Sequence, residues 1–309
     1  MDFELDAEQQ AILEAVAALL AQHAGPKRAI ELNRKSEYDG ALEAALDAAG
    51  FLGVALAEGT GLLEAALVVE AVAKAGGVVG IGAAALVAPG LAGGTLPGPI
   101  ALARAGDTAP VRFAAQARTL LVDAGDEAQR IALAPGDATP IASNFMLPMG
   151  RLRASLGRGE SLGPGSGQRL RNLWRLALAA ETVGAMAACL EVTLAYVKRR
   201  RQFGRAIGSF QAVQHRLAQC AVLVEGSRWL VYEAAFQDAP EEATAAAAAH
   251  AAAAASLVFS DTHQFTGAMG FTREHDLHVW SMRLQALRLE AGGVAGHRRA
   301  LAEARWCRK

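Results

Sequence analysis

The sequence predicts a mostly α-helical protein in which a β-rich segment separates two helical parts. Apolar residues recur at helical spacing over residues 1–90 and again over residues 167–309. Between them, over residues 91–166, glycine and proline become dense and the helical periodicity disappears. We therefore expect three domains: an N-terminal helical domain, a β-domain and a C-terminal antiparallel four-helix bundle, because long helices with short connections pack in this way.

The N-terminal part contains clear helix signals. Asp6 and Gln9 have the spacing of a capping box, which predicts a helix over residues 7–23 that Gly25-Pro26 ends. Three more helices are expected, over residues 40–49, 62–75 (capped by Thr60) and 78–88. The last of these is rich in glycine, alanine and valine, so we expect it to be buried.

The middle and C-terminal parts have different local patterns. In the middle part, three short apolar runs predict strands: Val111–Phe113, Thr119–Val122 and Arg130–Leu133. In the C-terminal part, helical periodicity predicts helices over residues 168–199, 211–236, 241–266, 274–289 and 295–305. Basic residues at the end of the first of these helices suit the negative end of its dipole.

The composition excludes several classes of protein. The formal net charge is −1 at pH 7, so no global field favours nucleic acid or anionic lipid. Three cysteines without metal-ligand spacing indicate a reducing compartment, and no signal peptide opens the chain, so we expect a cytoplasmic protein. The alanine-rich run over residues 243–256 is too weakly apolar for a membrane span, so we expect a tightly packed soluble helix.

Two motifs stand out in the C-terminal part. The first, residues 200–215, reads RRQFGRAIGSFQAVQH and joins two expected helices through a glycine-broken turn. The second, residues 264–272, reads QFTGAMGFT. Together and in this order they resemble the signatures of the flavin-dependent acyl-CoA dehydrogenases, R-x-Q-F-G followed by F-Q-x-x-x-H, and then Q-x-x-G-G-x-G-F-T. The expected N-terminal helices also resemble the N-terminal helical domain of that family.

The resemblance implies an FAD site shared between subunits. In this family the C-terminal bundle of one subunit clamps the ADP half of an FAD that a neighbouring subunit mainly holds. The implied FAD-binding residues are Arg200, Gln202, Phe203, Phe210, Gln211, Gln264, Gly267 and Ala268. Their types suit this task, because a pyrophosphate prefers a forked cation, amides donate and accept hydrogen bonds, and phenylalanine rings form apolar walls for adenosine. Ala268 stands where the family usually has a second glycine, which makes close approach of the backbone to a phosphate harder.

Each of these residues also has an ordinary structural interpretation. An arginine run at a helix end is commonly solvated, and Phe203 and Phe210 could belong to the core. His215 fits a structural histidine better than an acid or base. His275 and His278 lie among acidic residues, but the family has a histidine at the position of His278, so we expect no metal site.

The β-domain is shorter than that of the family and lacks its flavin-holding motifs. A T-E-P followed by G-S-D, and a later W-I-[ST], have no counterpart in residues 91–166. Either these motifs have been lost, which we favour, or they have diverged beyond recognition. The resemblance is therefore weakest where the family holds the flavin.

The two positions that carry the catalytic glutamate in this family hold other residues here. The family's reaction removes an α-proton of an acyl-CoA with a carboxylate while the β-hydrogen leaves as hydride to the flavin. One position, counted from the second motif, is Ala291, and the other, counted back from the first motif, is Trp174. Glu290 is one residue from the first position, but one step along a helix turns a side chain by about 100°, so we expect Glu290 to point away unless a local shift restores it. Trp174 is also bulky enough to fill the acyl pocket.

These features together resemble the shortened, non-catalytic subunit of the heterotetrameric acyl-CoA dehydrogenases of bacterial steroid side-chain degradation. The resemblance implies an α2β2 complex with a full-length dehydrogenase chain. That partner would bind most of the acyl-CoA substrate, share two FAD molecules with this chain and pass electrons to an electron-transfer acceptor. Two competing hypotheses stay open: a self-sufficient homo-oligomeric acyl-CoA dehydrogenase that uses Glu290 or an unrecognised base, and a helical scaffold without flavin.

Overall fold

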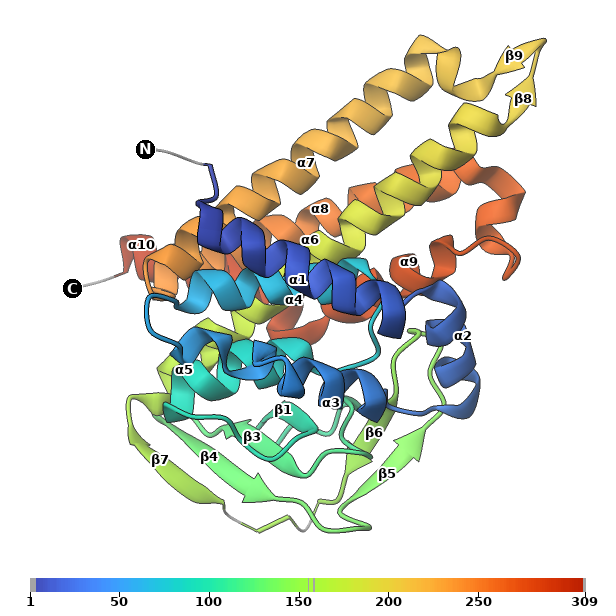
Figure 1. Cartoon of the computed structure of the whole chain (residues 1–309). Helices are drawn as coiled ribbons and strands as arrows, with labels where there is room; N and C mark the ends of the chain where they lie inside the picture. Colours follow the sequence, from blue (N-terminus) through green and yellow to red (C-terminus); the bar gives the residue numbers. More distant parts are fainter. Residues whose placement is uncertain (1–3, 155, 158, 308–309) are drawn as a thin grey trace.

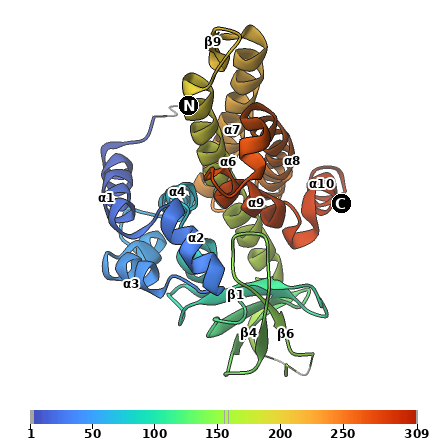
Figure 2. The same ribbon diagram turned by 90° about the vertical axis from the view of Figure 1, so that its right-hand side faces the viewer.

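Figure 1 shows a helical N-terminal part, a small β part and a bundle of long helices that extends beyond the other two. The structure is a computed structural model, and it describes residues 4–154, 156–157 and 159–307. The N-terminal helices cover one side of the bundle, and the small β part lies at the end of the molecule opposite the free end of the bundle (Figures 1 and 2). The expected fold is confirmed: an N-terminal helical domain, a small β-domain and a C-terminal helical bundle.

The N-terminal part differs from the predicted elements mainly by one additional helix. Its helices are α1 (Ala7–His23), α2 (Pro26–Lys35), α3 (Gly40–Ala48), α4 (Leu62–Lys74) and α5 (Ala88–Ala92), with a 3-10 helix η1 (Phe51–Leu56) between α3 and α4. The predicted capping box is present, because Gln9 N donates to Asp6 Oδ1 at 2.8 Å. Helix α2 is not among the predicted elements, since Gly25-Pro26 ends α1 but also begins α2, where proline is tolerated at the first helical position.

Two other details of the N-terminal part correct the sequence interpretation. The N-cap of α4 is Gly61 and not Thr60, whose hydroxyl donates to the carbonyl of Ala57 at 2.9 Å. The segment predicted as a buried helix over residues 78–88 is buried, but its regular part is a π-helix, η2 (Gly82–Val87). A Cβ at Gly82 would lie 2.5 Å from Oε1 of Glu181, so only glycine lets the backbone approach this carboxylate.

The β-domain consists of two sheets. The first sheet has the order β1-β3-β4-β7 and contains β1 (Ile100–Arg104), β3 (Thr119–Asp123), β4 (Glu127–Ala132) and β7 (Glu160–Pro164). The second has the order β2-β6-β5 and contains β2 (Val111–Arg112), β6 (Met149–Leu152) and β5 (Ala138–Ile141). Strands β1 and β3 are parallel, and the other pairs are antiparallel. The three predicted strands are present as β2, β3 and β4, whereas alanine, glycine or proline weakens the strand signal of the others.

Helix α6 (Ser166–Arg199) is the central element of the C-terminal part. It is followed by a hairpin of β8 (Arg201–Gln202) and β9 (Arg205–Ala206), and then by η3 (Ile207–Ser209), α7 (Gln211–Phe236), α8 (Glu241–Thr266), η4 (Gly267–Phe271), α9 (Leu277–Leu287), η5 (Glu290–Gly292) and α10 (Gly293–Trp306). Helix α6 packs against α4, α7, α8 and α9, and most of its side chains are buried. The helices predicted in this part are confirmed, although α9 begins at Leu277, because the residues before it form turns.

Among the described residues, two stretches are long and apolar enough to cross a membrane when only length and composition are considered: α6 and the run from Glu241 to Phe271. Both pack inside the structure, and most of the apolar window of each is buried. Core helices of folded domains meet the same criterion, so length and composition do not identify these two stretches as membrane spans.

Helices α4 and α6 approach each other closely at Gly184. A Cβ on Gly184 would lie 2.3 Å from the carbonyl oxygen of Glu70 and 2.9 Å from the amide nitrogen of Lys74. The contact between the N-terminal domain and the bundle therefore depends on the absence of a side chain at this position.

We expect Gly184→Ala to lower the free energy of unfolding by about 1–3 kcal/mol, because the added methyl group would force α4 and α6 apart. The matched control is Gly226→Ala in α7, whose Cβ would meet only His250, at 3.5 Å. The higher helix propensity of alanine should there raise the free energy of unfolding by up to about 1 kcal/mol. Urea unfolding followed by circular dichroism measures both changes. Equal effects of the two substitutions would contradict the close approach of α4 and α6.

Candidate functional site

The first motif forms the hairpin at the free end of the bundle (Figure 1). Its turn residues, Phe203 and Gly204, have φ values of 52° and 78°. Both values lie in the left-handed region that a tight two-residue hairpin turn requires. Phe203 at the tip is 89% exposed, so it is not a core residue.

Aromatic and cationic side chains pack against one another beside this turn. The rings of Phe203 and Phe210 meet edge to face with their centroids 6.1 Å apart, and the Arg205 guanidinium lies 4.0 Å from the Phe210 centroid. The carbonyl of Arg200 accepts a hydrogen bond from the amide of Ile207 at 2.8 Å, which closes the base of the hairpin. The motif therefore has a defined shape that presents Phe203 outward.

The second motif lies at the end of α8, next to the start of α7. Arg216 of α7 forms an ion pair with Asp261 of α8, and its guanidinium lies 5.1 Å from the ring centroid of Phe265. Gly267 follows with a φ of 58° and begins the turn η4. These contacts place both motifs at the same end of the bundle.

The predicted FAD-binding residues lie on the surface of this end. Phe210 is half-buried, and the exposed ones are Arg200, Gln202, Phe203, Gln211, Gln264, Gly267 and Ala268. Within the residues that the structure describes, the side chains of the arginine and the three glutamines in this set have no hydrogen-bond partner. Their donors and acceptors are therefore free for a ligand or a neighbouring chain.

The two positions without a catalytic glutamate lie close together in space. Trp174 of α6 and Ala291 of η5 both line one cavity of about 270 Å³. Ala291 has a φ of 51°, and its carbonyl accepts a hydrogen bond from Arg104 Nη2 at 2.9 Å. Neither the indole nor the methyl side chain can take a proton from a substrate.

Glu290 points toward Trp174 and not away from it. Trp174 Nε1 donates to Glu290 Oε1 at 2.8 Å. The expectation that Glu290 turns away is wrong because it assumes a regular helix, whereas Ala291 is left-handed and η5 is a short 3-10 turn. The local shift that the sequence left open is present, and Glu290 lines the same cavity as Trp174.

Arg112 of β2 joins Glu290 to Glu181 of α6, and we call these three residues the arginine–glutamate cluster. Arg112 Nε donates to Glu290 Oε2 at 2.6 Å, and Arg112 Nη1 donates to Glu181 Oε2 at 2.5 Å. Burial alone would lower the pKa of Arg112, but the charges of the two carboxylates and the hydrogen bonds to them outweigh burial and raise it. Burial also raises the pKa of Glu181, and the charge of Arg112 offsets part of that shift.

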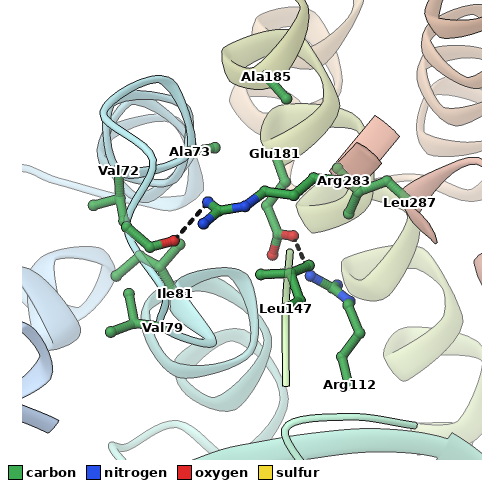
Figure 3. A pocket seen from close by; sticks show the side chains of 11 residues that line it. Val72, Ala73, Val79, Ile81, Arg112, Leu147, Glu181, Ala185, Arg283 and Leu287 are labelled. Carbon is green, nitrogen blue, oxygen red and sulfur yellow. Dashed lines mark hydrogen bonds and ion pairs between the residues drawn. The ribbon is translucent and has the colours of Figure 1, made fainter. Parts of the chain in front are cut away.

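Figure 3 shows Glu181 between Arg112 and a second buried arginine, Arg283 of α9. The Arg283 guanidinium donates to the carbonyl of Gly77 at 2.8 Å and to that of Gly76 at 3.1 Å. Burial lowers the pKa of Arg283 to about 10, and the charge of Glu181 opposes that shift. Arg283 thus fixes α9 to the loop that follows α4.

The ion pair between Arg112 and Glu181 has little open space beside it. Two hollows of about 20 Å³ each border the ion pair between Arg112 and Glu181. Each has room for about one water molecule, which is too little for an acyl chain. The cavity beside Trp174 and Glu290 is larger, but it adjoins the charged side chains of Arg104 and Arg112.

A buried histidine lies behind η5. His297 of α10 is 1% exposed, and burial together with the charges of Arg175 and Arg104 lowers its pKa to about 4. Burial lowers the pKa of Arg175 as well. His297 is therefore uncharged at neutral pH and adds no positive charge beside these arginines.

His275 and His278 have structural contacts. His278 Nδ1 lies 2.9 Å from the carbonyl oxygen of His275, and the His275 ring packs edge-on against Tyr196. Across the described part of the chain, no three His, Cys, Asp or Glu residues are grouped in a way that could hold a metal ion. The expectation that His215 is a structural histidine is not met, because its side chain is exposed on α7 and has no hydrogen bond or ring contact among the described residues.

Three charged residues of the site are absent from the sequence interpretation: Arg112, Glu181 and Arg283. Glu181 carries a usable signal, because a carboxylate in the middle of an apolar helix needs a buried partner. The two arginines have no such signal in the sequence, because their partners are far away along the chain. Arg112 is 69 residues from Glu181, and Arg283 is 207 residues from Gly76.

Comparisons with known proteins agree on one family. The family model of the acyl-CoA dehydrogenase C-terminal domain matches residues 168–305, and that of the acyl-CoA dehydrogenase N-terminal domain matches residues 6–96. Acyl-CoA dehydrogenase IpdE2 of Mycolicibacterium smegmatis is 33% identical over 299 residues, which cover 89% of this chain and 92% of the relative.

Solved structures agree on the fold. The ChsE4-ChsE5 complex from Mycobacterium tuberculosis contains a chain that matches with a TM-score of 0.82 at 22% identity, over 98% of both chains. A variant of the Tcur3481-Tcur3483 steroid ACAD matches with a TM-score of 0.81 at 24% identity, over 96% of this chain and 97% of that chain. At these identities the similarity concerns the fold alone.

We expect Arg112→Met to lower the free energy of unfolding by about 3–5 kcal/mol, because it leaves the buried Glu181 and the half-buried Glu290 without their cation. The matched control is Arg130→Met, which removes the cation of the exposed pair with Glu160 and should cost at most about 1 kcal/mol. Chemical denaturation of both variants measures the difference. A loss for Arg112→Met as small as that of the control would contradict the arginine–glutamate cluster.

His297 should make the protein less stable in acid. Its pKa in the folded chain is about 4, against 6.5 for an ordinary histidine, so the unfolded chain binds more protons between these values and stability falls as the pH is lowered from about 6.5 to 4. Between pH 7 and pH 4.5, wild type should lose about 2–3 kcal/mol more stability than His297→Leu. The control His215→Leu, at an exposed position, should have the pH dependence of wild type. If stability changed with pH in the same way in all three proteins, His297 would not be the cause of the loss of stability in acid.

Proposed function

The chain belongs to the acyl-CoA dehydrogenase family, and from that premise we propose that it is the non-catalytic subunit of a heteromeric, FAD-dependent acyl-CoA dehydrogenase. The observation that carries the proposal is the arrangement around the two base positions. Trp174 and Ala291 occupy those positions, and the neighbouring carboxylate, Glu290, is bound by Trp174 and Arg112. This chain would therefore contribute to the cofactor site and leave proton abstraction to its partner.

The hydrogen bonds of the Glu290 carboxylate support the proposal that the partner, and not this chain, supplies the base. A general base must lie within about 2.6–3.2 Å of the proton that it removes, with an oxygen free to accept it. Oε1 of Glu290 already accepts from the Trp174 indole, and Oε2 already accepts from Arg112 Nε. Both oxygens of Glu290 are therefore already hydrogen-bonded within this chain, and a substrate would have to compete with the guanidinium for this carboxylate.

The residues of this chain fit one half of FAD. When bound, FAD supplies the acceptor for the hydride that leaves the β-carbon of the substrate. Arg200, Gln202, Gln211 and Gln264 present forked and amide donors at the free end of the bundle, which suits a pyrophosphate. Phe203 at the exposed hairpin tip suits the apolar face of adenosine.

The same chain does not fit the flavin ring. The cavity beside Trp174 has a volume of about 270 Å³, below the range of about 300–1,000 Å³ that small-molecule sites commonly have. Arg112 and Glu290 line it with charge, and the β-domain motifs that hold the ring in the resembled family have no counterpart. We therefore infer that the ring lies in a partner chain.

The partner that this chemistry requires is a full-length acyl-CoA dehydrogenase chain in an α2β2 complex. That chain would supply the base, most of the acyl-CoA site and the ring half of each FAD, and an electron-transfer acceptor would reoxidise the flavin. The similar structures ChsE4-ChsE5 and Tcur3481-Tcur3483 each pair two named components, which supports a heteromer. The second of them is described as a steroid ACAD, which supports α,β-desaturation of a steroid-derived acyl-CoA in the cytoplasm.

One observation favours a second candidate, a self-sufficient homo-oligomeric acyl-CoA dehydrogenase. Glu290 faces the cavity of about 270 Å³ instead of pointing away from it. If Arg112 released it on substrate binding, Glu290 would be the base. The substitution of Glu290 described below separates the two candidates.

We expect Arg200→Ala to weaken FAD retention by the assembled complex about ten- to a hundredfold, because a charge-assisted contact to a phosphate is lost. Gln211→Ala should weaken it in the same direction. Arg34→Ala, at an exposed position on α2, makes the same chemical change and should leave retention unchanged. Flavin absorbance after dialysis measures FAD retention in all three variants. Full flavin occupancy in both Arg200→Ala and Gln211→Ala would contradict the proposal that these residues bind the ADP half of FAD.

Glu290→Gln should leave the turnover rate of the assembled complex within about threefold of wild type. Glutamine keeps the shape of the side chain but cannot act as the base. The turnover rate would therefore fall severely only if Glu290 were catalytic, since loss of one general base typically lowers the rate about 10²–10⁴-fold. The assay is acyl-CoA-dependent reduction of an artificial electron acceptor, with thermal unfolding as a check on the fold. A rate lower by several orders of magnitude in a folded complex would establish Glu290 as the base and reject the non-catalytic role.

A further inference from the structure

The hairpin between α6 and α7 contains an exposed arginine that has no part in the function proposed so far. Arg205 of β9 pairs directly with Gln202 of β8, and Arg201 pairs with Ala206. The side chains of two residues that pair across antiparallel strands lie on the same face of the hairpin. Arg205 is therefore the neighbour of Gln202, which is one of the residues proposed to bind FAD.

The register of the hairpin places Arg200 on the same face. The backbone of Arg200 is extended, with φ of −68° and ψ of 123°, and its carbonyl accepts a hydrogen bond from the amide of Ile207 at 2.8 Å, which continues the pairing. Side chains alternate between the two faces along an extended chain, so Arg200 and Gln202 share one face and Arg201 lies on the other. One face thus carries the guanidinium groups of Arg200 and Arg205 with an amide between them.

Phe210 holds the guanidinium of Arg205 in position. The guanidinium lies over the Phe210 ring, 4.0 Å from its centroid, and this ring meets Phe203 edge to face. An arginine that stacks on an aromatic face keeps the N–H donors at the edge of its planar group. Among the described residues, the side chain of Arg205 has no hydrogen-bond or ion-pair partner, so these donors are available to an anion.

The hairpin has no acidic residue that could neutralise these cations. Residues 200–210 contain three arginines and no aspartate or glutamate. A pyrophosphate carries a negative charge on each of its phosphates, and forked guanidinium donors bind phosphate oxygens strongly. Two arginines on one face therefore match the charge of a pyrophosphate better than that of a single phosphate.

We propose that Arg205 binds the second phosphate of the FAD pyrophosphate while Arg200 binds the first, so that this face of the hairpin selects a pyrophosphate over a single phosphate. The inference rests on the proposed function, because it adds a residue to the same FAD site. Phe210 supports the contact by fixing the Arg205 guanidinium before the cofactor binds.

Titration of FAD into the flavin-free assembled complex, followed by calorimetry, tests the proposal. Arg205→Met should weaken FAD binding about ten- to a hundredfold, because a charge-assisted contact to a phosphate is lost. The matched control Arg201→Met removes the same charge from the opposite face and should stay within about twofold of wild type. Equal affinities of the two variants would overturn the proposal.

Arg200→Ala, measured in the same titration, separates this inference from the proposed function. If Arg200→Ala weakens FAD binding but Arg205→Met does not, the FAD site at the hairpin stands and only the role of Arg205 is refuted. If neither substitution weakens FAD binding, the site itself is refuted. Failure of the complex to assemble with Arg205→Met would show that Arg205 contacts the partner protein instead, and would also overturn the proposal.

ADP and AMP distinguish a phosphate contact from a general loss of hairpin structure. The flavin-free wild-type complex should bind ADP about tenfold more tightly than AMP, because only ADP has the second phosphate. Arg205→Met should remove most of this preference, and Arg201→Met should keep it. A disordered hairpin would weaken both nucleotides alike, so an unchanged preference in Arg205→Met would contradict binding of the second phosphate by Arg205.

Discussion

The guanidinium of Arg112 is the constraint on which the candidate site depends. It comes from the β-domain, and it lies between Glu181 of the central helix α6 and Glu290 of the turn η5. Arg112 pairs with both carboxylates, and this pairing offsets the unfavourable burial of the charges. The cluster therefore joins the β-domain to two elements of the bundle, and Arg283 extends this connection to the loop after α4.

The same cluster determines what the site can do. It occupies the space beside Trp174, leaves hollows of about 20 Å³, and holds the carboxylate that lies nearest the position of the family's base. At the free end of the bundle, by contrast, the side chains proposed to bind the FAD pyrophosphate, Arg200, Gln202, Gln211 and Gln264, are exposed and have no hydrogen-bond partner among the described residues. The interior of this chain is thus occupied by its own side chains, whereas the free end of its bundle can still bind a ligand. This combination suits a subunit that contributes residues to a cofactor site of a neighbouring chain.

Local signals of the sequence predict the long helices well and the site only in part. The capping box at Asp6 and the apolar periodicity of residues 168–199 each act within a few turns, so they can be seen in the sequence. The direction of Glu290 cannot, because it depends on the left-handed backbone at Ala291, a conformation that alanine rarely adopts. The role of Arg112 cannot be predicted from the sequence for a different reason: its two carboxylate partners come from distant segments that are close only in the folded chain.

Native mass measurement with flavin counting tests the central claim most directly. The chain would be purified together with a full-length acyl-CoA dehydrogenase chain, and the assembled species would be weighed before and after release of the cofactor. The account predicts a tetramer of two chains of each kind that carries two FAD molecules, and a colourless protein when this chain is purified alone. Four FAD molecules per tetramer, or a stable yellow homotetramer of this chain, would contradict it.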